Sequence, residues 1–154
     1  MILIESYLCN DRGENFVKVS PDMTYTISNT RYITGAIELN VDGVCIFDKS
    51  MWDLVDQLWV YIINTLEDLR SNGSGESYFP DQPLKFSFVR LSGNMIRIDS
   101  FPGQDHYTAV VDATTLLSEL RHAGLLFFES IAQLLPELAD AYKLYVSKLR
   151  TLRL

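Results

Sequence analysis

Residues 36–47, with the sequence AIELNVDGVCIF, restrict the fold of this chain more than any other segment. Asp42 and Gly43 accommodate the positive φ angles of a two-residue type I′ turn, which predicts an antiparallel hairpin around them. In that hairpin Leu39 lies opposite Ile46. Alternate residues form one apolar face, which consists of Ile37, Leu39, Val41, Val44 and Ile46. One face of the hairpin is therefore expected to be buried, and the other to be at least partly in contact with water.

A long amphipathic helix is predicted directly after the hairpin, from Ser50 to Arg70. Ser50 with Asp53 three residues later resembles a capping box, and acidic side chains favour the positive end of a helix. Apolar residues recur at helical spacing and form its main core stripe: Met51, Val55, Leu58, Ile62, Leu66 and Leu69. The sequence SNGSGES follows, and residues 71–77 are expected to form a flexible loop.

The second half of the chain is expected to form a three-strand meander followed by two helices. The strands are predicted at residues 84–91, 95–101 and 105–112, and turn residues separate them. After residue 114 apolar residues again recur at helical spacing, which predicts a helix. Pro136 suits the first turn of a last helix. These elements predict an α+β fold, in which an antiparallel sheet is accompanied by one helix inserted mid-chain and two C-terminal helices. A length of 154 residues fits a single domain spanning 1–154.

The net charge and the hydropathy of the chain restrict which partners and which cellular compartment are expected. The net charge is −7, and residues 1–89 carry all of it. Such an acidic half repels nucleic acid, so no nucleic-acid partner is expected, whereas a basic protein would be attracted. The longest apolar runs, LWVYII and AGLLFF, are far shorter than a membrane helix requires, so no membrane association is expected. No signal peptide is recognisable and there are only two cysteines, which predicts a cytoplasmic location.

The chain contains no complete sequence motif for catalysis, cofactor binding or metal binding, so we expect no enzyme activity, no cofactor and no metal. The only Gly-x-Gly follows a helix rather than a strand, and the phosphate-binding lysine motif is absent. Cys9 and Cys45 stand alone, without the spacing of zinc ligands. Glu119 and His122 have the Glu-x-x-His spacing of di-iron bundles, but those sites require a second such motif and further glutamates.

One face of the meander gathers charged side chains. If Gly93-Asn94 and Pro102-Gly103 each close a two-residue turn, Arg90 lies opposite Arg97 and Asp99 lies opposite His106. The phenylalanines 86, 88 and 101 would then share that face. Two arginines beside an Asp–His pair suit an anion, a carboxylate-rich partner or an oriented catalytic base. The alternative is an ordinary wet face of a sheet that packs on one side only.

The predicted helix 50–70 has a second apolar flank, formed by Trp52 and Trp59 with Asp56 between them. Tryptophans dominate the energetics of protein interfaces, and an acid between them suits a Lys or Arg of a partner. The same spacing is also typical of a helix whose two apolar sides are both buried in its own core. This flank, or the narrow apolar seam of the last helix, could also seal a homodimer.

The stretches GAIELNVDGVCIFDKSMWDLVDQLW and YFPDQP, in an acidic α+β chain of this size, resemble the small cytoplasmic bacterial immunity proteins of polymorphic toxin systems. That resemblance implies a protein that binds a cognate toxin and blocks it without catalysis. The expected function is therefore a non-enzymatic protein-binding module, most sharply a toxin-neutralising one. The alternative is a small-ligand or anion-binding protein, or an enzyme, that uses Arg90, Arg97, Asp99 and His106.

The hexapeptide YFPDQP, residues 78–83, precedes the first strand of the meander. Phe79 and Gln82 each stand before a proline, which favours extended backbone, and Pro80-Asp81 suits the centre of a tight turn. We therefore expect this segment to be a clamp that leads the chain from helix to strand. Tyr78 and Phe79 are expected to anchor it to the core.

Overall fold

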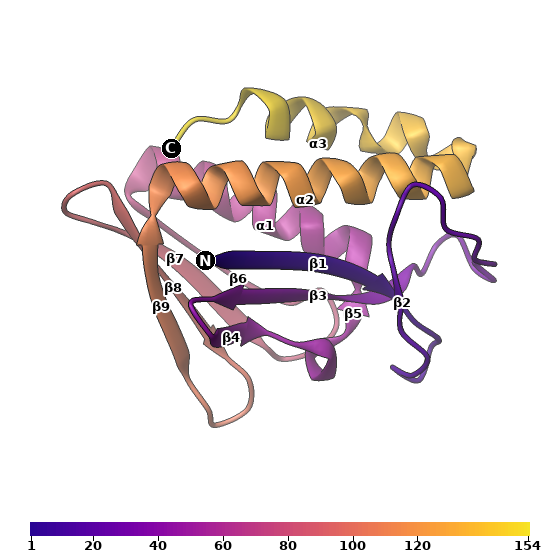
Figure 1. Cartoon of the computed structure of the whole chain (residues 1–154), viewed down its shortest axis with the longest axis horizontal. Coiled ribbons are helices and arrows are strands. Elements are labelled where there is room, and N and C mark those ends of the chain that lie inside the picture. Colours follow the sequence, from indigo (N-terminus) through magenta and orange to yellow (C-terminus); the bar gives the residue numbers. More distant parts are fainter.

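Two antiparallel β-sheets and three α-helices make up the structure, a computed structural model that describes residues 1–154 (Figure 1). The first sheet, sheet A, has the order β2-β1-β3-β4, and β5 pairs with β3. Its strands are β1 (Ile2–Leu8), β2 (Val17–Lys18), β3 (Thr34–Val41), β4 (Val44–Phe47) and β5 (Asp53–Leu54). The second sheet, sheet B, has the order β6-β7-β8-β9. Its strands are β6 (Ser74–Tyr78), β7 (Lys85–Leu91), β8 (Met95–Phe101) and β9 (Tyr107–Asp112).

The helices are α1 (Val55–Asn72), α2 (Ala113–Leu134) and α3 (Ala139–Thr151), with short 3₁₀ turns at Lys49–Met51 and Pro136–Leu138. Helix α1 lies mid-chain, and α2 and α3 follow the last strand. The predicted α+β class, with antiparallel strands, one inserted helix and two C-terminal helices, is therefore confirmed. The strands form two sheets rather than one.

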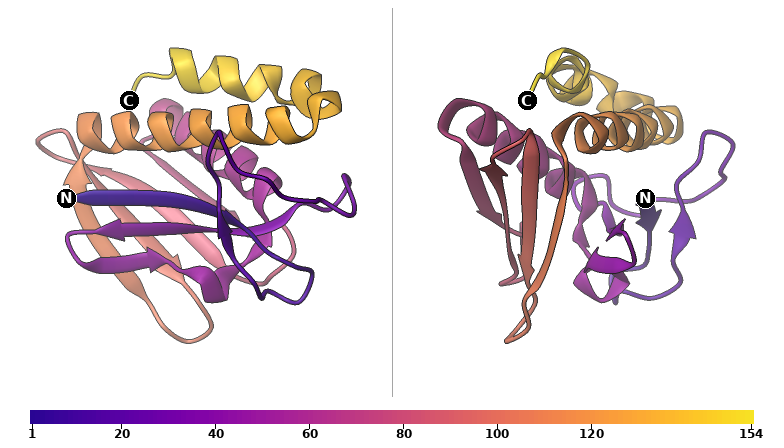
Figure 2. Two further views of the ribbon diagram at one scale, coloured as in Figure 1. Left: turned by 45° about the vertical axis from the view of Figure 1, so that its right-hand side comes forward. Right: turned by 60° about the vertical axis from the view of Figure 1, so that its left-hand side comes forward.

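The two sheets are separate layers, and α2 and α3 lie along one end of them (Figure 2). The sheets approach each other where β4 contacts β8 and β9, and there the Ser100 hydroxyl donates a 2.7 Å hydrogen bond to the carbonyl of Ile46. Edge-to-face aromatic contacts link both layers through Phe47 and Phe86, whose ring centroids are 5.5 Å apart. Helix α1 packs on β6 and β7, and α2 packs on β1. One continuous core therefore joins both sheets and the helices.

The predicted hairpin is present, but its register changes after two pairs. Val41 lies opposite Val44 and Asn40 opposite Cys45, and a bulge then places Leu39 opposite Phe47 rather than Ile46. A bulge inserts one unpaired residue and turns the strand locally. As a result Ile46 and Phe47 are both buried at the place where the two sheets meet.

The start of the first helix differs from the prediction. Helix α1 begins at Val55, because Asp53 belongs to β5 and pairs with Gly35 of β3. Asp48, not Ser50, caps the preceding 3₁₀ turn by accepting the Ser50 N–H at 2.8 Å. The Asp53 carboxylate is buried and accepts the N–H groups of Asp81 and Gln82 instead.

Residues 71–77 do not form the flexible loop that their composition suggested. Ser71 and Asn72 end α1, and Ser74–Tyr78 forms β6, which pairs with β7 along its whole length. The glycines have specific roles here. Gly73, at φ +79°, ends the helix and donates to the Leu69 carbonyl, and Gly75 packs so closely on α1 that a Cβ would lie 2.4 Å from the Thr65 carbonyl oxygen. Both glycines therefore fix the backbone rather than loosen it.

The YFPDQP segment was expected to lead from helix to strand, but it connects the paired strands β6 and β7, and only one of its two aromatic residues is an anchor. Phe79 is buried against Phe47 and Phe86, whereas Tyr78 is 62% exposed. The turn itself is held by Asp53, and the Gln82 side chain donates to the carbonyl of Trp52. The contacts of this segment are thus with Trp52 and Asp53, just before α1, and with the aromatic core.

Candidate functional site

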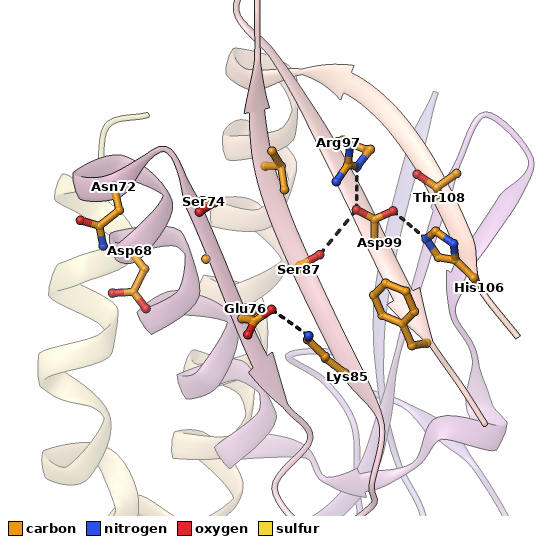
Figure 3. A pocket seen from close by; sticks show the side chains of 13 residues that line it. Asp68, Asn72, Ser74, Glu76, Lys85, Ser87, Arg97, Asp99, His106 and Thr108 are labelled. Carbon is orange, nitrogen blue, oxygen red and sulfur yellow. Dashed lines mark hydrogen bonds and ion pairs between the residues drawn. The ribbon is translucent and has the colours of Figure 1, made fainter. Parts of the chain in front are cut away.

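The face of sheet B that points away from sheet A carries polar side chains from all four strands (Figure 3), and we call it the sheet-B outer face. It is hollowed, with a volume of about 910 Å³. Asp68 and Asn72 from the end of α1 and Glu76 of β6 line one side of the hollow. His106, just before β9, and Thr108 of β9 line the other side. No other element of the chain covers this face in Figure 2.

Asp99 is the centre of a charged network at the floor of this hollow. Its side chain is only 4% exposed, and it pairs with Arg97 Nε at 2.8 Å and with His106 Nε2 at 2.8 Å. Burial by itself would raise the pKa of Asp99, but hydrogen bonds from Arg97, His106 and Thr108 outweigh it and hold the pKa below its usual value. The carboxylate is therefore charged at neutral pH and fixes the directions of both basic side chains.

Further contacts hold the basic side chains in place. The His106 ring stacks on Phe101, with ring centroids 4.5 Å apart, and Lys85 pairs with Glu76 at 2.8 Å. Arg97 and His106 remain 44% and 51% exposed despite their bonds to Asp99. Only the Nε atom of Arg97 bonds to protein, so its two terminal nitrogens carry no protein hydrogen bond. The hollow thus presents a positioned guanidinium and imidazole to anything that enters it.

Three of the four residues predicted on this face come together, and Arg90 does not. The turn between β7 and β8 has three residues rather than two, so Arg90 lies opposite Ile96 and on the other face from Arg97. The same change turns Phe86 and Phe88 into the core. A slip of one residue moves a side chain to the other face of a sheet, and this is the physical reason for the error.

The Asp99–His106 contact is kept although the predicted register of β9 is also wrong. Asp99 lies opposite Thr108 rather than His106, because the loop after Phe101 is longer than two residues. A shift of two residues leaves each side chain on the same face, since the period of a strand is two. His106, just before β9 begins, therefore still reaches Asp99.

The tryptophan flank is largely part of the fold. Trp59 is 0% exposed and donates from Nε1 to the Ser6 hydroxyl at 3.0 Å, and Asp56 accepts from the Tyr142 hydroxyl of α3 at 3.0 Å. Trp52 is partly exposed and lies over the turn at Gly13, where a Cβ would be 2.1 Å from its indole nitrogen. Of the two alternatives for this flank, the packed core is the one that the structure shows for Trp59.

The apolar seam of α3 is also occupied within the chain. Tyr142 and Leu149 are buried, Leu149 would meet a Cβ at Gly124 of α2, and the Tyr142 ring lies 4.9 Å from that of Phe128. Helix α3 uses this seam to pack on α2 and α1. The buried part of this seam is therefore available to a second copy of the chain only if α3 detaches from α2.

The sequence interpretation missed the side of the hollow that α1 and β6 supply. Ser74 and Glu76 were not predicted as site residues because residues 71–77 were expected to form a loop. The segment SGESY has no alternation of apolar and polar residues, so the sequence carries no strand signal there, although its burial alternates in the structure.

The chemistry of the hollow is that of binding and of acid–base contact. No cluster of three or more His, Cys, Asp or Glu side chains is placed to hold a metal ion.

No known protein family, curated protein or solved structure matches the chain. None of the helices combines the length and the apolar character required to cross a membrane.

Proposed function

We propose that this chain is a non-enzymatic protein-binding module that uses the sheet-B outer face to hold its partner. The observation that supports this most is the Arg97–Asp99–His106 network on an uncovered, hollowed sheet. A buried carboxylate that fixes two half-exposed basic groups gives a surface organised before binding, which lowers the entropy lost on association. The resemblance of the sequence to immunity proteins makes neutralisation of a bacterial toxin in the cytoplasm the sharpest form of this proposal.

The charges of the hollow suit a partner with both signs on its surface. Asp68 and Glu76 lie on the side of α1 and β6, and Arg97 and His106 lie on the side of β8 and β9. A basic side chain of the partner would face the first pair and an acidic one the second, which selects both partner and orientation. The net charge of −7 would speed the approach of a basic partner.

Co-expression with the product of the neighbouring gene tests this proposal. We expect the two proteins to co-elute, and Arg97→Gln to weaken the complex by about tenfold or more, the loss typical of an organised interface residue. Lys143→Gln, a change at an exposed side chain of α3, is the matched control and should leave the affinity unchanged. Absence of a complex, together with a neighbouring gene that encodes no toxin, would sink the toxin-neutralising proposal.

A second candidate function is the binding of a small carboxylate or other anion, or acid–base catalysis on one. The observation in its favour is the 2.8 Å contact of His106 Nε2 with the buried Asp99, because an aspartate that orients a histidine is a common feature of catalytic bases. Titration with succinate, followed by side-chain NMR signals of Arg97 and His106, distinguishes the two functions. Saturable shifts that disappear in Asp99→Asn would favour the small ligand over the protein partner.

A further inference from the structure

We propose that a second site, separate from the sheet-B outer face, binds the phosphate group of a small molecule in a hollow between α2 and the end of α3. The hollow has a volume of about 470 Å³, and Arg121, Arg150 and Arg153 all line it. Thr114 and Ser118, from the first two turns of α2, supply hydroxyl groups to the same hollow. Three arginines in one hollow stand out in a chain whose net charge is −7.

Two of these guanidinium groups donate hydrogen bonds to the same carbonyl oxygen. Arg121 donates from Nη2 to the carbonyl of Leu152 at 2.5 Å and from Nε to that of Leu149 at 2.6 Å. Arg153 donates from Nη1 to the same carbonyl of Leu152 at 3.1 Å. These carbonyls are groups that the end of a helix leaves without partners, which explains why Arg121 is held there. Two positive charges are thereby kept close together.

Neither of these two arginines has a carboxylate partner. No ion pair within 4.0 Å involves Arg121 or Arg153, whereas Arg150 pairs with Glu129 at 3.2 Å. Asp112, next to the hollow, is engaged as the cap of α2, where it accepts the Thr115 N–H at 2.9 Å. With Glu129 set against Arg150, the positive charges of Arg121 and Arg153 remain without an ion pair, and both groups bond only to backbone carbonyls. Like charges at such short range repel, and an anion between them would remove that repulsion.

The uncompensated charge and the donor geometry together indicate a phosphate group. A doubly charged oxyanion neutralises two guanidinium groups, which a single carboxylate does not. Planar guanidinium groups bind phosphate oxygens through paired hydrogen bonds, and Arg121 Nη1 has no protein acceptor. The hydroxyls of Thr114 and Ser118 are further donors, while Ala113 and Leu117 provide apolar wall. The volume is in the range of small-molecule sites, so we assign the hollow to a small phosphorylated compound or to free phosphate.

Isothermal titration of the full chain with inorganic phosphate and with glycerol phosphate tests the site, in buffers matched in ionic strength with sodium chloride. We expect saturable binding that Arg153→Gln weakens by about tenfold, the cost of one charge-assisted hydrogen bond. Arg150→Gln should also weaken it, and both positions are exposed, so neither change threatens folding. Lys143→Gln, on the same helix but outside the hollow, should bind like the wild type.

The results of these titrations distinguish a phosphorylated small molecule from free phosphate, and they also show whether the proposal fails. Tighter binding of glycerol phosphate would assign the site to a phosphorylated small molecule, and tighter binding of inorganic phosphate would assign it to the free ion. Equal heats with phosphate and with chloride at the same ionic strength would overturn the proposal. Undiminished affinity in Arg153→Gln would overturn it as well. None of these results depends on whether the sheet-B outer face binds a protein.

Discussion

At the scale of single residues, Asp53 joins two segments that are far apart in the sequence. Its carboxylate is buried, has no basic partner, and accepts the N–H groups of Leu54, Asp81 and Gln82. Asp53→Asn replaces one acceptor oxygen with a donor, so we expect it to lower the free energy of unfolding by about 1.5 to 3 kcal/mol in urea denaturation. Asp81→Asn, an exposed position in the same turn, is the control. Equal losses in the two variants would contradict this role of Asp53.

A second prediction for a single residue concerns Asp56 and the dependence of the stability of the fold on pH. Burial raises the pKa of Asp56 above its usual value, although hydrogen bonds from Tyr142 and from the backbone partly oppose the shift. The folded chain then holds a proton that the unfolded chain has lost, so this carboxyl lowers stability as the pH rises from about 4 through its folded pKa. The free energy of unfolding of Asp56→Asn, relative to the wild type, should therefore increase between pH 4 and pH 7.

The control for Asp56 is the exposed Asp140 of α3. Lys143 lowers the pKa of Asp140, so its contribution to stability has the opposite sign and is lost as the pH falls. Urea denaturation of Asp56→Asn and Asp140→Asn across the same pH series compares the two carboxyl groups directly. A pH-independent difference between Asp56→Asn and the wild type would show that burial of Asp56 has no such effect.

At the scale of elements, the positions of strands β7 and β8 could be predicted from the sequence within a residue, but their register could not. Alternation and turn residues locate a strand, whereas register depends on the number of residues in each turn. One extra residue in the turn at Gly93 removed Arg90 from the site, and the two-residue shift after Phe101 left His106 in it. The β6 side of the hollow was missed for a different reason. There the glycines that indicate a loop allow close packing on α1 instead.

In the segment 78–83, one of two adjacent aromatic residues anchors the chain to the core and the other is exposed. Phe79 is 4% exposed and packs on two other phenylalanines, whereas the Tyr78 side chain lies on the surface. We expect Phe79→Ala to lower the free energy of unfolding by about 3 to 5 kcal/mol, as for other buried phenylalanines. Tyr78→Ala, its matched control, should change it by about 0.5 kcal/mol or less. Similar losses in the two variants would show that the clamp depends on both aromatic residues.

The packing of α2 against α3 depends on Gly124. A Cβ at this position would lie 2.7 Å from Leu149 Cδ1 and 3.2 Å from Trp59, and both side chains are completely buried. Gly124→Ala should gain about 1 kcal/mol of helix propensity but lose about 1 to 3 kcal/mol through overpacking, so we expect a net loss in thermal or urea denaturation. In a Leu149→Val background, which removes the clashing atom, the same substitution should be neutral or stabilising. A net gain in the wild-type background would contradict the close contact.

At the scale of the whole molecule, the α+β class follows from local patterns, but the division of the strands into two sheets does not. The N-terminal strands and the meander carry the same kind of alternation, and nothing local shows that β1 pairs with β3 while β6 joins the meander. The β1–β3 pairing, and the bond between Ser100 and Ile46 where the layers meet, join residues far apart in the sequence. The buried face of each sheet is consequently defined only once the other sheet is in place.

This mutual dependence predicts that the chain unfolds in a single transition. One cluster of 34 buried hydrophobic residues includes members from both sheets and all three helices. Tryptophan fluorescence reports on Trp52 and on Trp59, of which Trp59 belongs to that cluster. Fluorescence and far-ultraviolet circular dichroism should therefore give coincident urea transitions. Phe88→Ala in sheet B and Leu39→Ala in sheet A should each shift both signals to lower urea by the same amount, because neither sheet has a separate core. If Phe88→Ala moved the dichroism transition and left the fluorescence transition in place, sheet B would be unfolding as an independent unit.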